Sequence, residues 1–161
     1  MGMITLVLGG ARSGKSAVAE GLAGDGHVLY VATADIGDDA DFAGRVERHR
    51  ARRPASWSTI EAGPDLAAEL RARTDGTALV DSLGTWVARC EDFAADGDAL
   101  VAALRARTGP TVIVSEEVGL GVHPESEVGR RWRDALGEVN QAVAAAADEV
   151  LLVIAGRTLR L

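Results

Sequence analysis

The sequence is poor in the residues that several classes of protein depend on. Its 161 residues include one cysteine, Cys90, and only 4% are aromatic. A single cysteine excludes an internal disulfide and fits a reducing compartment. No apolar run is long enough to span a bilayer, and no charged-then-apolar leader is present. We therefore expect a cytoplasmic protein without a membrane partner.

Positive charge is also scarce. The net charge is −7, which argues against a general nucleic-acid or membrane-surface binder. Lys15 is the only lysine, and every other basic residue is an arginine. The length predicts one domain, residues 1–161, with a real hydrophobic core. Alanine supplies much of the apolar content, which predicts helices that pack closely through small side chains.

The lone lysine lies in the most informative stretch of the chain. Residues 9–16 match the phosphate-loop pattern G-x-x-x-x-G-K-[ST], in which backbone N–H groups surround phosphate oxygens, Lys15 reaches the outer phosphates and Ser16 binds Mg²⁺. The alternative is a glycine turn with a surface lysine. The context favours the loop, because an apolar strand over residues 3–8 precedes it and a helix over residues 16–23 follows. A phosphate would then lie at a helix N-terminus.

Strands and helices alternate along the rest of the chain, which predicts a mostly parallel sheet with helices on both faces. The fold class is therefore α/β, a three-layer P-loop NTPase (RecA-like) fold that ends in a short antiparallel strand. The expected strands span residues 27–32, 57–61, 77–81, 111–114, 149–155 and 158–161, and the expected helices span residues 38–53, 65–73, 82–93, 97–107 and 126–147.

Polar residues follow two of the expected strands at their carboxyl ends, where ligands collect in open α/β sheets. Residues 33–35 follow one of them. Asp81 ends another and is a candidate partner of Mg²⁺. Taken alone, Asp81 fits equally well as the N-cap of the next helix.

Basic charge is concentrated in one segment of this acidic chain. Five arginines lie within residues 45–53 and surround His49. This segment is either a solvated basic face or a binding site for an anion such as a triphosphate. Nearby cations would lower the pKa of His49 and keep its imidazole neutral, as a nucleophile must be.

The chain resembles the bifunctional adenosylcobinamide kinase and adenosylcobinamide-phosphate guanylyltransferase family of cobalamin synthesis. The phosphate loop alone would indicate only a superfamily, whereas the E-V-G-x-G-x-x-P run joined to V-N-Q and A-D-E-V is specific. The similarity is carried by residues 9–16, residues 29–34, residues 45–54 with Trp57 and Glu61, residues 117–125, Arg133-Asp134, Gly137, Val139-Asn140-Gln141 and residues 144–150.

The resemblance implies two reactions. ATP or GTP phosphorylates the aminopropanol hydroxyl of adenosylcobinamide, and GTP then guanylylates a histidine that passes GMP to adenosylcobinamide phosphate. The reactive histidine falls on His49, with Mg²⁺ at Ser16 and Asp81. The resemblance also implies a homotrimer, with nucleotide sites near subunit contacts. The nucleotide contacts fall on Gly9, Gly10, Ala11, Arg12, Ser13, Gly14, Lys15, Ser16, Thr33, Ala34, Asp35, Arg50, Ala51, Arg52, Arg53, Glu61 and Asp81.

Two other functions fit the phosphate loop. Another small-molecule kinase of this class would keep residues 9–16 and Asp81 but would not need His49. A nucleotide-dependent, RecA-like interaction module would bind nucleotide without transferring a group. No general base for the kinase step stands out in the sequence, although Glu116 and Glu117 are candidates.

Overall fold

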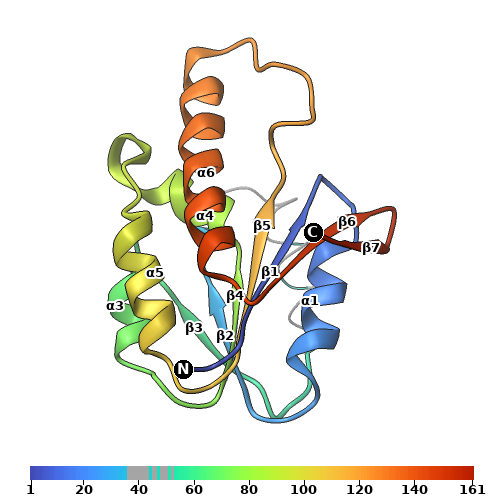
Figure 1. Cartoon of the computed structure of the whole chain (residues 1–161), viewed down its shortest axis with the longest axis vertical. Helices are drawn as coiled ribbons and strands as arrows, with labels where there is room; N and C mark the ends of the chain where they lie inside the picture. Colours follow the sequence, from blue (N-terminus) through green and yellow to red (C-terminus); the bar gives the residue numbers. More distant parts are fainter. Residues whose placement is uncertain (36–43, 45–46, 48–50, 52) are drawn as a thin grey trace.

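The computed structural model describes residues 1–35, 44, 47, 51 and 53–161. These residues form a seven-stranded sheet in the order β3-β2-β4-β5-β1-β6-β7 (Figure 1). Its strands are β1 (Ile4–Gly9), β2 (Val28–Ala32), β3 (Ser58–Glu61), β4 (Thr77–Asp81), β5 (Thr111–Glu116), β6 (Glu149–Ile154) and β7 (Arg157–Arg160). All neighbouring pairs are parallel except β6 and β7, which confirms the predicted antiparallel last strand.

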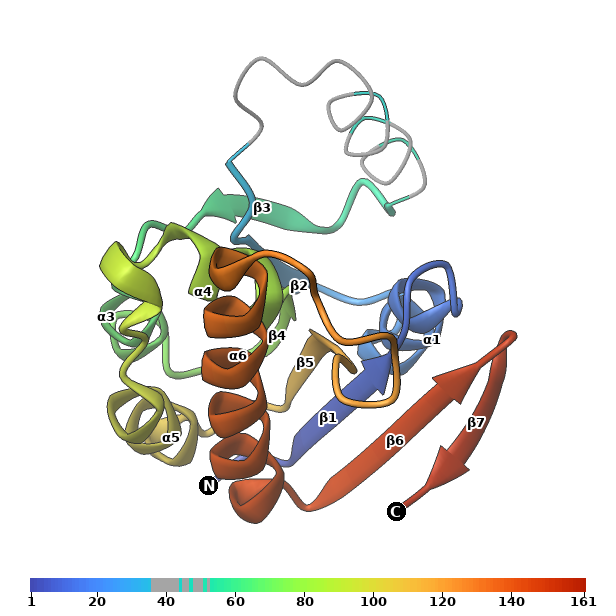
Figure 2. The same ribbon diagram turned by 90° about the horizontal axis from the view of Figure 1, so that it is seen from above.

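Helices cover both faces of the sheet, so the fold has three layers (Figure 2). Helix α1 (Lys15–Ala23) lies on one face, and the other face carries α3 (Leu66–Arg71), α4 (Leu83–Arg89), α5 (Gly97–Ala106) and α6 (Glu127–Ala146). A short 3-10 helix, η1 (Glu91–Phe93), follows α4. Within the described part of the chain, no helix has the length and apolar character needed to cross a membrane.

Two hydrophobic clusters fill the spaces between these layers. On the α1 side, Ala19 packs with sheet residues that include Val7 and Val114. On the other side, leucines of α3, α4, α5 and α6 pack against residues such as Leu6 and Ile113. Successive strand residues point to opposite faces, so each central strand contributes to both clusters. This explains why the strands are continuous apolar runs in the sequence.

Most predicted elements are confirmed, and most of them differ from the prediction by one or two residues at an end. Three differences in bounds have a clear physical cause. The helix expected over residues 82–93 ends at Arg89, because Cys90 is extended and Asp92 has a φ of 52°. Strand β5 continues past Val114, since Ser115 and Glu116 still pair with β1. The helix expected from residue 65 begins one residue later, because Asp65 is its N-cap.

One predicted helix lies mostly outside the described residues. Of the residues expected in it, 38–53, only Gly44, Glu47, Ala51 and Arg53 are described, and the first three have helical backbone conformation.

Candidate nucleotide site

The phosphate loop connects β1 to α1, as the sequence predicts. The loop closes through Gly14, which has a φ of 93° and a ψ of 6° and immediately precedes the helix. A Cβ at Gly14 would also lie 3.3 Å from the Cα of Gly156. Both the left-handed backbone and the close approach therefore favour glycine at this position.

The loop contains a buried serine and a lysine that folds back over it. Ser13 is only 8% exposed, and its Oγ has no hydrogen-bond partner among the residues that the structure describes. The Nζ atom of Lys15 lies 3.3 Å from the carbonyl oxygen of Gly10, so this side chain folds back over the loop. The Ser13 hydroxyl is buried against protein, so the Lys15 ammonium group and the N-terminus of α1 are the parts of the loop that attract an anion. The loop residues therefore fit a phosphate group.

Distant parts of the chain hold the loop in place. The N–H of Gly156, in the turn between β6 and β7, donates to the carbonyl oxygen of Ser13 at 2.7 Å. The N–H of Glu117, just after β5, donates to the carbonyl oxygen of Gly9 at 3.1 Å. Because both strands that flank β1 contribute a contact, the shape of the loop depends on the complete central sheet.

Asp81 ends β4, and β5 lies between this strand and the phosphate-loop strand β1. The Tyr30 hydroxyl donates to Oδ2 of Asp81 at 2.8 Å. Burial, followed by the negative charge of Asp81, raises the pKa of Tyr30 well above its usual range. The N-cap of α4 is Ser82, so the alternative interpretation of Asp81 as an N-cap is wrong. Asp81 is half-buried at the carboxyl edge of the sheet.

The oxygens of Ser16 and Asp81 suit a hard cation. Mg²⁺ usually binds one or two protein oxygens together with substrate phosphates and water. Among the residues that the structure describes, no group of three or more His, Cys, Asp or Glu side chains could hold a metal by itself. The donor set fits a magnesium ion that arrives with a nucleotide.

Thr33 lies just past β2, and its side chain is fully buried. Its hydroxyl oxygen is 2.6 Å from the Ser82 carbonyl oxygen and 2.6 Å from Oγ1 of Thr85, and it accepts from the Ser82 N–H at 2.8 Å. The Thr33 side chain thus joins β2 to the start of α4. A contact with nucleotide stays a prediction for Thr33, as it does for half-buried Ala34 and exposed Asp35.

Arg53 is the described arginine of the basic segment. Its guanidinium carbon lies 3.3 Å from the centroid of the Tyr30 ring, and one of its nitrogens is 3.3 Å from Oγ1 of Thr59. Trp57 stacks with Tyr30 at a centroid distance of 6.4 Å. These contacts fix the C-terminal end of the basic segment beside the strand pair β2 and β3, next to the tyrosine that binds Asp81.

The other predicted residues of this region divide into two groups. Ala51 and Glu61 are exposed, and Glu61 ends β3 opposite Ala32. His49 lies outside the described residues, together with Arg50 and Arg52. The structure therefore does not place the predicted nucleophile, and its role stays a prediction.

Both candidate general bases, Glu116 and Glu117, already accept hydrogen bonds from backbone N–H groups. The carboxylate of Glu116 accepts from Oγ of Ser82 at 2.9 Å and from the N–H of Gly84 at 3.0 Å. Glu117 accepts from the N–H groups of Gly119 and Leu120 at 2.7 and 3.1 Å. Sequence reasoning missed the role of Ser82, although a serine directly after a strand-ending aspartate is a signal for an N-cap.

A pocket of about 510 Å³ opens beside the predicted nucleotide contacts. Ala34 and Asp35 line it from the end of β2, and Thr85 and Arg89 line it from α4. One guanidinium nitrogen of Arg89 donates to the carbonyl oxygens of Ala62 and Thr33, at 2.7 and 3.3 Å. This pocket, which we call the α4 pocket, places a cationic side chain near the carboxyl ends of β2 and β3.

Comparison with solved structures supports the fold. The flagellar accessory protein FlaH from Methanocaldococcus jannaschii, a P-loop NTPase, superimposes with a TM-score of 0.53 at 14% sequence identity. The match covers 97% of this chain and 74% of FlaH. At this identity the likeness concerns the fold alone, which is the P-loop NTPase fold predicted from the sequence.

Comparison of sequences identifies closer relatives. The bifunctional adenosylcobalamin biosynthesis protein CobP from Pseudomonas aeruginosa is 42% identical over 164 residues, which cover 96% of this chain and 94% of CobP. The corresponding protein CobU from Salmonella typhimurium is 42% identical over 176 residues, which cover 96% of this chain and 97% of CobU. Residues 5–161 match the family described as cobinamide kinase / cobinamide phosphate guanyltransferase. With nearly its whole length matched, the chain belongs to this family.

Proposed function

We propose that this protein phosphorylates adenosylcobinamide and then transfers GMP from GTP to adenosylcobinamide phosphate. Membership of the family supports both activities. The observation that carries the proposal is the phosphate loop, in which Lys15 folds over the loop at the N-terminus of α1. Such a loop fits the phosphate chain of ATP or GTP.

In the kinase reaction, the γ-phosphoryl group leaves the nucleotide and bonds to the hydroxyl oxygen of the aminopropanol arm. The loop N–H groups and Lys15 orient the phosphates and offset the charge that develops on the leaving oxygen. Ser16 and Asp81 would hold Mg²⁺, which when bound supplies further positive charge to the phosphates. The Tyr30 hydroxyl, bonded to one oxygen of Asp81, leaves the other oxygen available.

In the transferase reaction, His49 attacks the α-phosphorus of GTP. A bond forms between the imidazole nitrogen and phosphorus, and the bond to the pyrophosphate oxygen breaks. A phosphate oxygen of adenosylcobinamide phosphate then attacks the same phosphorus and releases the histidine, giving adenosylcobinamide-GDP. Splitting the reaction in this way avoids a direct displacement between two anions, and the neighbouring arginines Arg50, Arg52 and Arg53 reduce the remaining repulsion.

Labelling with GTP that carries a radioactive α-phosphate tests this proposal. The wild-type protein should acquire an acid-labile, alkali-stable label, as a phosphoramidate requires, and His49→Ala should acquire none. His27→Ala is a matched control, because His27 is exposed at the opposite edge of the sheet. Equal labelling of His49→Ala and the wild type would refute the assignment of the nucleophile.

The same experiment separates the two alternative functions. Turnover of the γ-phosphate without any α-label would favour another small-molecule kinase. Nucleotide binding without transfer of either phosphate would favour an interaction module.

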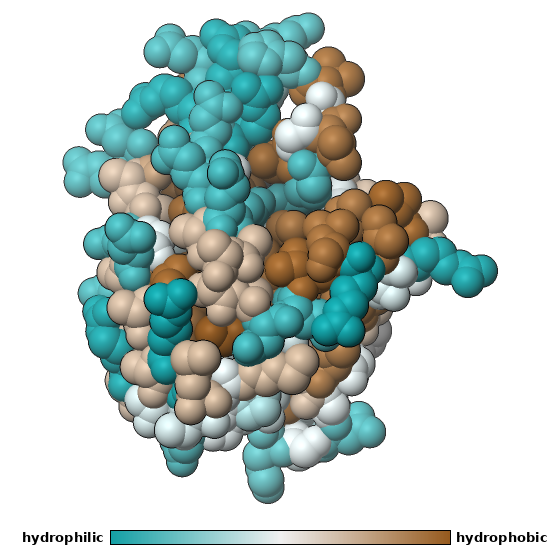
Figure 3. Space-filling model, viewed as in Figure 1, coloured by the Kyte–Doolittle hydropathy of each residue, from teal (hydrophilic) through white to brown (hydrophobic). Residues whose placement is uncertain are grey.

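We also propose that the protein is a homotrimer, as the family resemblance implies. Apolar side chains support an interface at the β6–β7 edge of the sheet, where Ile154 and Leu159 are 59% and 57% exposed. Leu159 pairs with Leu152, so these three side chains share one face of the hairpin. Figure 3 shows this apolar surface beside the loop that carries the exposed Leu120.

Light scattering during size-exclusion chromatography measures the assembly. Ile154→Glu should shift the mass toward the monomer, whereas Leu22→Glu, at an exposed leucine of α1, should not. A monomeric wild-type protein would refute the trimer.

A further inference from the structure

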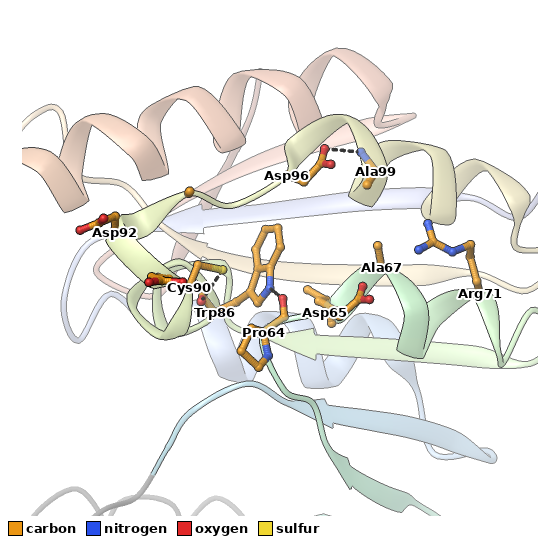
Figure 4. Close-up of a pocket in the computed structure, with 12 residues that line it drawn as sticks. Pro64, Asp65, Ala67, Arg71, Trp86, Cys90, Asp92, Asp96 and Ala99 are labelled. Atoms are coloured by element: carbon orange, nitrogen blue, oxygen red, sulfur yellow. Dashed lines mark hydrogen bonds between the residues drawn. The ribbon is translucent and has the colours of Figure 1, made fainter.

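A second pocket, of about 700 Å³, lies on the face of the sheet that carries α3, α4 and α5 (Figure 4). Residues from the start of α3, the end of α4, η1 and the start of α5 line it, and we call it the α3–α5 pocket. Its volume falls within the range of small-molecule sites, about 300–1,000 Å³. None of the described residues assigned to the nucleotide lines this pocket.

The interior of the α3–α5 pocket is mostly apolar and rigid. The Trp86 indole stands between Pro64 and the start of α5 in Figure 4, and its Nε1 donates to the Pro64 carbonyl oxygen at 2.6 Å. Leu66 and Ala67 contribute from α3, and Ala99 contributes from α5. Trp86 is only 2% exposed, so its position is set by packing on all sides.

The rim of the α3–α5 pocket is acidic. Asp65, Glu91, Asp92 and Asp96 contribute carboxylates and Arg71 a cation, and a guanidinium nitrogen of Arg131 lies 3.4 Å from Oδ1 of Asp92. Asp65 and Asp96 each use one oxygen, Oδ1, to accept a backbone N–H as N-caps, which leaves the second oxygen of each. An apolar interior with an acidic rim suits a ligand that has an apolar body, a positive charge and N–H donors.

The α3–α5 pocket adjoins the α4 pocket described above. Pro64 lines both pockets, so the two lie side by side at this residue. The α4 pocket is lined in turn by Ala34 and Asp35, at the carboxyl end of β2. An arm that extends past Pro64 from the α3–α5 pocket would therefore enter the α4 pocket, at the carboxyl ends of β2 and β3.

We infer that the α3–α5 pocket binds the corrin body of adenosylcobinamide, an inference that rests on the proposed function. The cobalt corrin carries a net positive charge, its methyl-substituted ring is apolar, and its carboxamide arms donate N–H groups. These properties complement the acidic rim and the apolar interior. The aminopropanol arm, which receives the phosphoryl group, then passes through the α4 pocket toward the nucleotide.

Cys90 provides a direct test, because it lines the α3–α5 pocket and is the only cysteine of the chain. The rate of its modification by a maleimide is measured in the dark with and without adenosylcobinamide. At a corrinoid concentration ten times the dissociation constant, the reaction should slow about tenfold, in proportion to the free fraction. An unchanged rate, under conditions where calorimetry shows the corrinoid bound, would overturn the inference.

Charge reversal at the rim provides a second test. Glu91→Lys should raise the KM for adenosylcobinamide about three- to tenfold in the kinase assay, while the KM for the nucleotide stays unchanged. Asp25→Lys is the matched control, because it makes the same change at an exposed site beyond α1. Equal KM values for the two variants would overturn the inference.

The labelling of the protein by α-labelled GTP without corrinoid separates this inference from the proposed function. Full labelling combined with an unprotected Cys90 would refute the corrin site alone. A wild-type protein that neither acquires the label nor phosphorylates adenosylcobinamide would refute the proposed function itself.

Discussion

Replacing Thr33 with valine tests whether its hydroxyl holds the end of β2 to the start of α4. Valine keeps nearly the same shape, so the fully buried side chain would change little in packing. The variant loses the contacts of the hydroxyl with Ser82 and Thr85 at 2.6–2.8 Å. The Ser82 N–H would retain only Oγ1 of Thr85, at 3.3 Å.

The expected loss of stability follows from these contacts. A hydrogen bond contributes about 0.5–1.5 kcal/mol net, and a buried polar group left without a good partner costs about 1–3 kcal/mol. Because Thr85 compensates in part, we expect Thr33→Val to lower the free energy of unfolding by about 2–3 kcal/mol. For a chain of this size, that corresponds to a fall in Tm of roughly 5–10 °C.

Urea unfolding followed by circular dichroism measures this change, and Thr33→Ser is the matched control. Serine keeps the oxygen and loses one methyl group, which costs about 1 kcal/mol. A Thr33→Val protein as stable as Thr33→Ser would refute the reasoning. If its stability were unchanged but its affinity for GTP fell, the side chain would instead contact the nucleotide directly.

Three further predictions concern single groups. Tyr30 is the only tyrosine, and burial beside Asp81 raises its pKa, so its phenolate absorbance should appear only above the ordinary pKa of 10.0. The unfolding free energy should fall as the pH rises past that value, because the unfolded chain then loses the proton first. A titration curve of an ordinary tyrosine would contradict this. Arg107 is fully buried and donates to Thr111 and to three backbone carbonyl groups. Arg107→Leu should therefore lower the unfolding free energy, measured by urea titration, by about 3–5 kcal/mol. A loss below about 1 kcal/mol would count against the contribution of these hydrogen bonds. Burial raises the pKa of Cys90 from its ordinary value of 9.0. The alkylation rate of the folded protein should therefore reach its midpoint at a higher pH than that of the urea-unfolded protein. Coincident curves of alkylation rate against pH would exclude the shift.

Local patterns explain why most of the fold could be predicted. The central strands are apolar runs because both faces of the sheet are covered, and Ser126 marks the start of α6 through its bond to the Gly129 N–H. The end of α4 could not be predicted in the same way. Nothing in its apolar pattern indicates that Asp92 takes a positive φ.

The site was predictable only where a motif is contiguous. Residues 9–16 form one loop, so the sequence shows the phosphate site directly. The contact of Tyr30 with Asp81, and that of Ser82 with Glu116, depend instead on strands that lie far apart in the chain. Chain topology brings these partners together, and a single sequence carries no direct signal of such pairing.

The contact between Gly156 and Ser13 has a consequence for biosynthesis. During translation, residues 9–16 are made long before Gly156, so this hydrogen bond forms only after the turn between β6 and β7 has been made. A chain truncated before this turn would lack one of the two backbone hydrogen bonds that hold the loop.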